Sequence, residues 1–476
     1  MMDDHLSGDE RTAAFISSLR WADLPDPVRR KAKMCLVDNA AALLAGTPTR
    51  LSQISAEYAA RLWRGDEASI VLHGKRSTAA GAAFANGNSA NAIDSDDSAR
   101  YAYGHAGAQL FPTVLALAEA RELSGQRLLT GLVVGYEVAH RIGRCWHDDH
   151  TVYQACGSWG SVACAAAAAH LLDLPADQAR HALGIADYHA PNAPMMRDIE
   201  QPAMVKHASG WGAMTGVMSA ELAACGYTGV PSLLAHEKYT AWVDDIGQNY
   251  LMVDGVAWKA KGFACCGWAH AASEGAKRLV DQYHLQAEEI DRIHIETFHN
   301  AMCLGTKLPT TTEEAQFNLA WPVAAMLADG EIGPAQTLES RLSDPRIRGL
   351  AARVAVSEAE DLNELCDLFQ RGDPRGRFAS RVTVTTTAGR VYESGLVGGG
   401  LRRAAGGGGH GRHGDPGRAG VRVMRYHSVT TADAMKPALG RALTPAQALG
   451  QKGYGHGVEA DSFGLGPGGQ LGVKAL

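Results

Sequence analysis

Most of the first half of the chain repeats apolar residues at the spacing of a buried helix face. Between Asp26-Pro27 and Gly46, apolar side chains return every three or four positions, and the residues at both ends are typical helix boundaries. Further stretches with this pattern are 79–90, 111–123, 128–142, 161–172, 176–185 and 210–225. Alanine, glycine and serine dominate them, which favours close helix packing. The pattern predicts a large all-helical domain over residues 1–265.

The pattern changes after about residue 265. Apolar and polar residues alternate in 293–297 and again in 382–386, before a turn at Ala388-Gly389, which indicates strands. The segments 315–327 and 350–356 have helical spacing. We therefore expect a smaller α+β domain over residues 266–396 and a mainly α fold for the whole chain.

Residues 397–476 are rich in glycine and have almost no periodic apolar pattern. Only the segment 432–448 has the spacing of a short helix. We expect this atypical tail to be poorly ordered, and a reading-frame change near Gly398 is one hypothesis for its abrupt start.

Composition narrows the class of protein. Hydrophobic residues make up 46% of the chain, and 45 basic residues against 51 acidic ones give a net charge of −6. This balance argues against a nucleic-acid or membrane-surface partner. The acidic start lacks the features of a signal peptide, no apolar run is long enough to cross a membrane, and nine cysteines cannot all pair. A soluble cytoplasmic protein is expected.

Common cofactor and nucleophile motifs are missing from the sequence, including the phosphate-binding loop, GxGxxG, HExxH and GxSxG. Cys265-Cys266 has no second cysteine pair, which disfavours a structural zinc site. We expect no cofactor and no tightly bound metal.

The most informative polar segment holds Asp94, Asp96 and Asp97, with His105 shortly after it. Three carboxylates this close repel one another. Three interpretations are open: a solvated loop with a helix cap, a divalent-cation site, or a carboxylate of raised pKa that works with His105 in acid–base catalysis.

Several segments resemble the MmgE/PrpD family in the same order along the chain. Residues 86–98 and the following Gly104-His105 are similar to the family's aspartate-rich D-F-D-D-T segment and the histidine after it. The other matching segments are 135–138 with 141–143, 157–161, Lys206 with Gly210, 259–266 with His270, and 314–318. The resemblance extends from about residue 12 to 396.

The resemblance implies a large helical domain with a smaller α+β lid, a homodimer, and a site between the domains that needs no organic cofactor or metal. Members of the family include 2-methylcitrate dehydratase, cis-aconitate decarboxylase and iminodisuccinate epimerase. They act on small polycarboxylates by making or breaking a C–H bond beside a carboxylate.

The resemblance assigns roles to residues that, taken singly, are more often a surface lysine, an incidental loop histidine or a buried cysteine. His105 is expected to transfer a proton, Asp94 to orient it or act as the partner acid, and Lys206 to hold developing negative charge. The expected substrate-binding residues are Ser98, Lys261, His150, Cys266, His270 and Trp321.

These assignments predict a lyase of the dehydratase type acting on a small di- or tricarboxylate. An epimerase or a decarboxylase would use the same apparatus. Two other classes stay open: an inactive carboxylate-binding homologue, and a metal-dependent hydrolase that uses the three aspartates.

Overall fold

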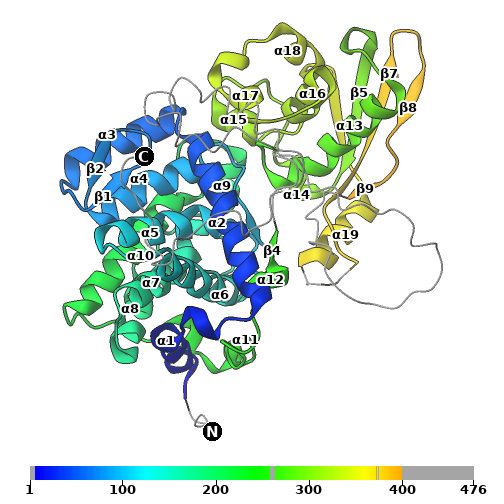
Figure 1. The fold of residues 1–476 in the computed structure, drawn as a ribbon. Coiled ribbons are helices and arrows are strands. Elements are labelled where there is room, and N and C mark those ends of the chain that lie inside the picture. Colours follow the sequence, from blue (N-terminus) through cyan, green and yellow to red (C-terminus); the bar gives the residue numbers. More distant parts are fainter. Residues whose placement is uncertain (1–5, 258–262, 371–372, 374, 399–476) are drawn as a thin grey trace.

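The computed structural model describes residues 6–257, 263–370, 373 and 375–398. Figure 1 shows a large helical domain, coloured blue to green, beside a smaller domain coloured green to orange. The helices of the first domain are α1 (Gly8–Ser18), α2 (Asp26–Gly46), α3 (Arg50–Leu62), α4 (Ala79–Asn91), α5 (Gly107–Ala120), α6 (Gly125–Asp149), α7 (Cys156–Leu171), α8 (Ala176–Tyr188), α9 (Met195–Glu200), α10 (Ser209–Ala224), α11 (Thr240–Val243) and α12 (Met252–Gly255).

Each helix predicted in the first domain is present, and α2 begins and ends at the expected residues, Asp26 and Gly46. The expectation that this domain contains helices alone is wrong. Strands β1 (Ala68–Ile70) and β2 (Lys75–Ser77) form an antiparallel hairpin. Strands β3 (Ser98–Ala99) and β4 (Val256–Ala257) pair across more than 150 residues of chain. Such short strands leave too few alternating positions for a sequence pattern to reveal them.

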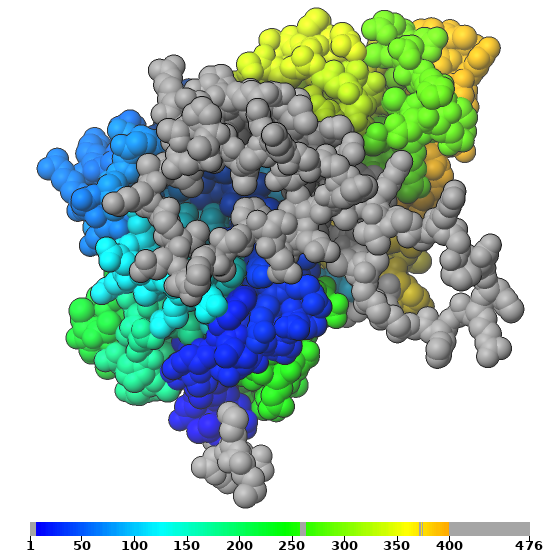
Figure 2. Space-filling model, in the orientation of Figure 1, coloured from blue at the N-terminus to red at the C-terminus, as the bar shows by residue number. Residues whose placement is uncertain are grey.

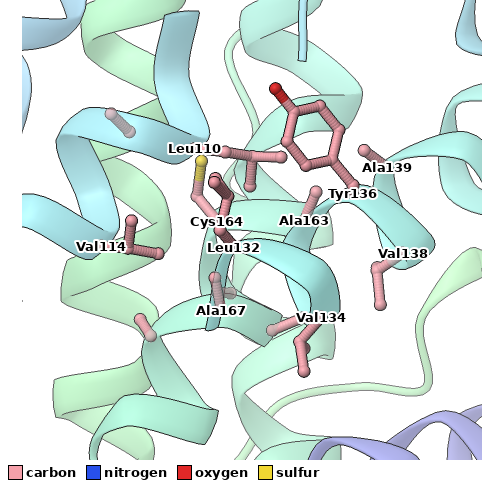
Figure 3. Close-up of a cluster of buried hydrophobic side chains, with 14 of the residues drawn as sticks. Leu110, Val114, Leu132, Val134, Tyr136, Val138, Ala139, Ala163, Cys164 and Ala167 are labelled. Atoms are coloured by element: carbon pink, nitrogen blue, oxygen red, sulfur yellow. The ribbon is translucent and has the colours of Figure 1, made fainter. Parts of the chain in front are cut away.

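The core of the first domain lies where α4, α5, α6, α7 and α10 pack together. Figure 3 shows part of it, with Leu110 and Val114 from α5 beside Cys164 and Ala167 from α7. Small side chains let the helices approach closely: a Cβ added at Gly216 of α10 would lie 2.3 Å from the Cβ of Cys164. The predicted close packing of small-residue helices is therefore confirmed.

The second domain is built on one mixed sheet with the order β6-β5-β7-β8, and β9 pairs with β7. Its strands are β5 (Ile290–Thr297), β6 (Val354–Glu358), β7 (Ala379–Thr386), β8 (Val391–Glu393) and β9 (Val397–Gly398). Its helices are α13 (His270–Tyr283), α14 (His299–Met302), α15 (Thr312–Gln316), α16 (Ala320–Asp329), α17 (Pro334–Thr337), α18 (Pro345–Ala351) and α19 (Glu360–Gln370).

In this domain one prediction from the sequence is wrong and another is confirmed. The helix expected over 350–356 is wrong, because α18 ends at Ala351 and residues from Val354 form β6, which pairs in parallel with β5. The apolar residues there fit a helix and a strand equally well, and pairing with β5 decides between them. The predicted turn at Ala388-Gly389 is confirmed between β7 and β8, and Gly389 adopts the positive φ of 76° that such a turn needs.

Helix α9 joins the two domains, because its Met195 and Ile199 pack into the second domain's core with Phe263 and Phe317. Figure 2 shows the two domains side by side on one face of the molecule. Within the described ranges, no helix is both long and apolar enough to span a bilayer. The glycine-rich tail and its possible helix at 432–448 lie outside the described residues, apart from its first two positions in β9.

Candidate functional site

The aspartate-rich segment is the connection between α4 and β3, and it is buried. Asp94, Asp96 and Asp97 each have 0% of their surface exposed. The interpretation of a solvated loop is therefore wrong. Asp94 has a φ of 52°, an uncommon backbone conformation for a residue with a side chain, which turns the chain sharply at this point.

Asp97 fixes this connection to three surrounding helices. Its carboxylate accepts hydrogen bonds from the hydroxyl of Tyr136, from the Gly107 N–H at 3.0 Å and from the Asn39 amide at 3.4 Å. Burial raises the pKa of Asp97, although the bonds from Tyr136 and Gly107 act in the opposite direction. Asp97 therefore holds the segment in place.

His105 lies among the carboxylates, as its position in the sequence predicted. Its Nδ1 is 2.8 Å from the backbone oxygen of Asp97 and 3.0 Å from Oδ2 of Asp96. Because both neighbours are acceptors, we assign the proton of neutral His105 to Nδ1. Its Nε2 then faces Asp94, whose Oδ1 is 3.6 Å away. Nε2 is therefore the atom of His105 that can gain or lose a proton.

Lys206 and His207 come from a strained turn before α10. Three successive residues, Lys206, His207 and Ala208, have positive φ values of 37°, 56° and 55°. Such conformations cost on the order of 1–3 kcal/mol for each residue with a side chain. Tight packing holds the turn, since a Cβ at Gly157 of α7 would lie 2.2 Å from the Ala208 oxygen. In a regular helix, neighbouring residues point about 100° apart. This turn instead directs Lys206 and His207 to the same site.

His207 is bound to Asp198 of α9. Both its backbone nitrogen and its Nδ1 lie 2.7 Å from Oδ2 of Asp198. Burial opposes ionisation of Asp198, but the hydrogen bonds from His207 and the positive charge of Lys206 act in the opposite direction, and the pKa of Asp198 is lowered. Burial also lowers the pKa of His207, and the bond to Asp198 only partly offsets this. These shifts favour an ionised Asp198 and a neutral His207 that carries its proton on Nδ1.

The second domain completes the site through Gln316 and Phe317. The Nζ of fully buried Lys206 donates to Oε1 of Gln316 at 2.8 Å, and Gln316 in turn donates to the backbone oxygen of Ala92 at 3.0 Å. The same Nζ lies 4.5 Å from the centre of the Phe317 ring, a cation–π contact. The group of Asp94, His105, Lys206 and His207 therefore lies where the two domains meet.

Four of the predicted substrate-binding residues lie outside the group formed by Asp94, His105, Lys206 and His207, or outside the described residues. Ser98 is half-buried in β3, opposite Ala257. Cys266 is buried and donates its backbone N–H to the Gln316 oxygen at 2.9 Å. His270 contacts the Cys265 oxygen at 3.0 Å and the edge of Phe263. Lys261 lies outside the described residues.

Two predicted residues are not brought to this group. Trp321 is fully buried in the core of the second domain, and its indole N–H donates to the Gln336 oxygen at 2.9 Å. His150 stacks on Trp146 and lines a separate hollow with Asp187 and Ser232. The structure thus gives Trp321 a packing role and places His150 elsewhere on the first domain.

Sequence reasoning did not select His207, Asp198 or Gln316 as site residues. His207 follows Lys206 directly, and a strained turn at this position would have been the signal, but the sequence does not reveal one. Asp198 stands in a segment without a chemical pattern of its own, and Gln316 occupies a position of the matched segment 314–318 to which the resemblance assigns no role. Only the folded chain brings them together.

One carboxylate oxygen of Asp94 and one imidazole nitrogen each of His105 and His207 lie within 4.8 Å of one another. Oxygen and nitrogen donors of this kind can hold a first-row divalent ion. The same atoms are also suited to proton transfer, because imidazoles titrate near neutral pH and the carboxylate stabilises their charged form.

The fold is thus that of a mainly helical, two-domain protein, with imidazoles, carboxylates and a buried lysine gathered at the domain boundary. Residues 10–246 match the MmgE/PrpD N-terminal domain, and residues 263–398 match the MmgE/PrpD C-terminal domain. The chain is a member of the MmgE/PrpD family, as its motifs indicated.

Similar proteins in this family are described as cis-aconitate decarboxylases. The protein of this name from Homo sapiens is 28% identical over 376 residues, which cover 74% of this chain and 77% of that protein. The one from Aspergillus terreus is 24% identical over 412 residues, covering 78% and 82%. The cis-aconitate decarboxylase-like protein oryM from Aspergillus oryzae is 26% identical over 358 residues, covering 67% and 73%.

Proposed function

We propose that this protein is a cofactor-independent lyase that acts on a small di- or tricarboxylate by proton transfer beside a carboxylate. The observation that carries the proposal is the full burial of Lys206 beside His207, whose ring centre lies 5.2 Å from that of His105. A buried cation is costly without negative charge nearby. Ionised Asp198 supplies some of that charge, and a bound polycarboxylate would supply more.

The chemistry requires a cation and a proton-transfer group together. When a proton or CO₂ leaves a carbon beside a carboxylate, the electron pair left behind spreads onto that carboxylate as an enolate-like charge. Lys206 is placed to stabilise this charge, and stabilisation of this kind is often the largest single contribution to catalysis. His105, with Nε2 facing Asp94, is placed to exchange a proton with the substrate.

Two lyase reactions fit this apparatus, and each has a measurable signature. Loss of CO₂ from a carboxylate, the reaction in the names of the similar proteins, takes up one proton for each CO₂ released. Loss of water from a hydroxy acid, the reaction expected from the sequence, takes up none. An epimerase would release neither, but would exchange a substrate hydrogen with solvent.

The test is to incubate the purified protein with cis-aconitate and with 2-methylcitrate in buffered D₂O. CO₂ release, proton uptake, formation of a double bond and deuterium incorporation are followed in the same samples. Lys206→Met should lose at least about 100-fold in kcat/KM, since charge stabilisation of this kind is worth about that much. Lys277→Met, on a partly exposed face of α13, is the matched control.

The proposal fails if the folded protein produces none of these signals with either acid. Binding of a polycarboxylate without turnover would instead support the inactive homologue. Deuterium incorporation without loss of CO₂ or water would support the epimerase.

A further inference from the structure

We propose that His207, held by Asp198, is the residue that takes a proton from the substrate carbon, while His105 is the proton donor. The inference rests on the proposed function and adds to it a second proton-transfer residue and a division of roles. Asp198 then acts through His207 and is a positioning residue.

The two histidines have similar positions relative to the Asp94 carboxylate. Nε2 of His105 lies 3.6 Å from Oδ1 of Asp94, and Nε2 of His207 lies 4.0 Å from the same oxygen. Their ring centres are 5.2 Å apart, and the ring planes are tilted by 32°. Both rings therefore present the same atom, Nε2, to one point, although they come from segments about a hundred residues apart.

The anchoring of His207 resembles that of a general base and not that of a packing residue. A carboxylate on Nδ1 fixes the tautomer, turns the ring and stabilises the imidazolium that forms when Nε2 accepts a proton. Asp198 supplies this contact and also binds the backbone nitrogen of His207, so ring and backbone are held by one oxygen. A histidine that only filled space would need neither this double contact nor the positive φ of 56°.

The charged and titratable groups that face His207 are Asp198 from α9, Asp94 and His105 from the connection after α4, and Lys206 beside it. From the second domain, the Phe317 ring lies 5.3 Å away. Burial and the positive charges of His105 and Lys206 lower the pKa of His207. Nearby positive charge therefore favours one protonated and one neutral imidazole, the state in which one acts as the acid and the other as the base.

The proton balance follows for an elimination of water. His207 takes the C–H proton, and the C–H electron pair forms the double bond. The C–O bond breaks, its electron pair leaves with the oxygen, and His105 supplies the proton that completes the water molecule. If the reaction is a decarboxylation, His105 alone supplies the proton of the new C–H bond, and the activity of His207 is visible as exchange of a substrate hydrogen with solvent.

The experiment compares His207→Gln and Asp198→Asn with wild type, and uses His189→Gln on an exposed position as the matched control. Deuterium exchange at the substrate carbon, kcat and KM are measured for each. We expect His207→Gln to lose at least about 100-fold in exchange, with KM changed less than threefold. Asp198→Asn should lose about tenfold in exchange with a similar KM, whereas loss of a merely structural contact would lower thermal stability and leave the exchange rate of the folded protein unchanged.

A readout that does not depend on turnover accompanies the kinetics. In protein labelled with ¹⁵N-histidine, the His207 signal, assigned with His207→Gln, should show a neutral ring with the proton on Nδ1 at neutral pH. A proton on Nε2 of the neutral ring would overturn the inference even if no substrate is found. Turnover by wild type without loss or exchange of a carbon-bound hydrogen, or with loss or exchange that survives His207→Gln, would overturn it and leave the proposed function intact.

Discussion

The Nζ of Lys206 and the Oε1 of Gln316 are joined by a 2.8 Å hydrogen bond that crosses the boundary between the two domains. Lys206 stands before α10 of the first domain and Gln316 ends α15 of the second. Because Gln316 also donates to the backbone oxygen of Ala92, one amide connects the lysine, the aspartate-rich segment and the second domain. The position of the second domain therefore controls the geometry of the site.

Replacing Gln316 by leucine tests this connection. The change leaves the buried Lys206 without this acceptor, which costs about 1–3 kcal/mol. We expect kcat/KM to fall at least tenfold and the melting temperature to decrease. Gln282→Leu, at an exposed position on α13, should change neither. Wild-type kcat/KM in Gln316→Leu would show that the bond does not position Lys206.

Replacing Gly157 by alanine tests the strained turn. The new Cβ would lie 2.2 Å from the oxygen of Ala208 and must push the turn that carries Lys206 and His207. We expect a loss of stability of about 1–3 kcal/mol and a fall in kcat of more than tenfold. Denaturant titration and steady-state kinetics measure the two effects.

Gly349 provides the control for that substitution. It lies inside α18, and nothing is within 4 Å of a Cβ added there. Gly349→Ala should keep full activity and stabilise the protein by about 0.5–1 kcal/mol, because alanine favours the helix. Equal activity losses in both variants would show that the contact between α7 and the turn is not responsible.

Asp9 predicts how stability depends on pH. Burial raises its pKa from 3.8 to about 6, although hydrogen bonds from Ser232 act in the opposite direction. A raised pKa in the folded state contributes stability that is complete below about pH 4 and is lost as the pH rises through about 6. The side chain of Asp9→Asn cannot ionise. The free energy of unfolding of this variant should therefore fall by up to about 3 kcal/mol less than that of wild type between pH 4 and 7. Equal pH dependence of unfolding in both proteins would contradict the prediction.

Removal of metal tests whether the protein is a metal-dependent hydrolase that uses the three aspartates. The Asp97 carboxylate accepts hydrogen bonds from Tyr136, Gly107 and Asn39. Because His105 and His207 are assigned to proton transfer, the proposed reaction needs no metal. Dialysis against EDTA should leave kcat within twofold of its starting value. Loss of activity that returns with one added divalent ion would favour a metal enzyme at Asp94, His105 and His207.

The apolar faces of α3 and α10 predict where the expected homodimer forms. Large apolar side chains are 37–51% exposed at helical spacing on both helices: Ile54, Tyr58, Leu62, Trp211, Met218 and Leu222. Helix α4 packs against both helices, and its Phe84 contacts Trp63 at the end of α3 and Trp211 of α10. We propose that a second copy covers them. Light scattering should give twice the chain mass, and Trp211→Glu should give the single-chain mass.

The chain itself shows how far local patterns reach. Apolar spacing predicted seven helices of the first domain, because a helix must bury one face whatever its neighbours are, but it did not select α1 or α3. It failed at residues 350–356, where only pairing of Val354–Glu358 with β5 selects a strand. Asp94 and His105 could be paired from the sequence because both belong to the segment that resembles the family's aspartate-rich motif and the histidine after it.

Tertiary structure decided the rest of the site. The sequence marked Lys206 through its motif, but it had no signal for the three left-handed residues that turn Lys206 and His207 to the same point, since packing against Gly157 imposes them. Asp198 and Gln316 reach the site from α9 and α15, elements fixed by the contact between two cores. Local sequence thus determined which groups are available for chemistry, and the packing of the two domains determined which of them meet.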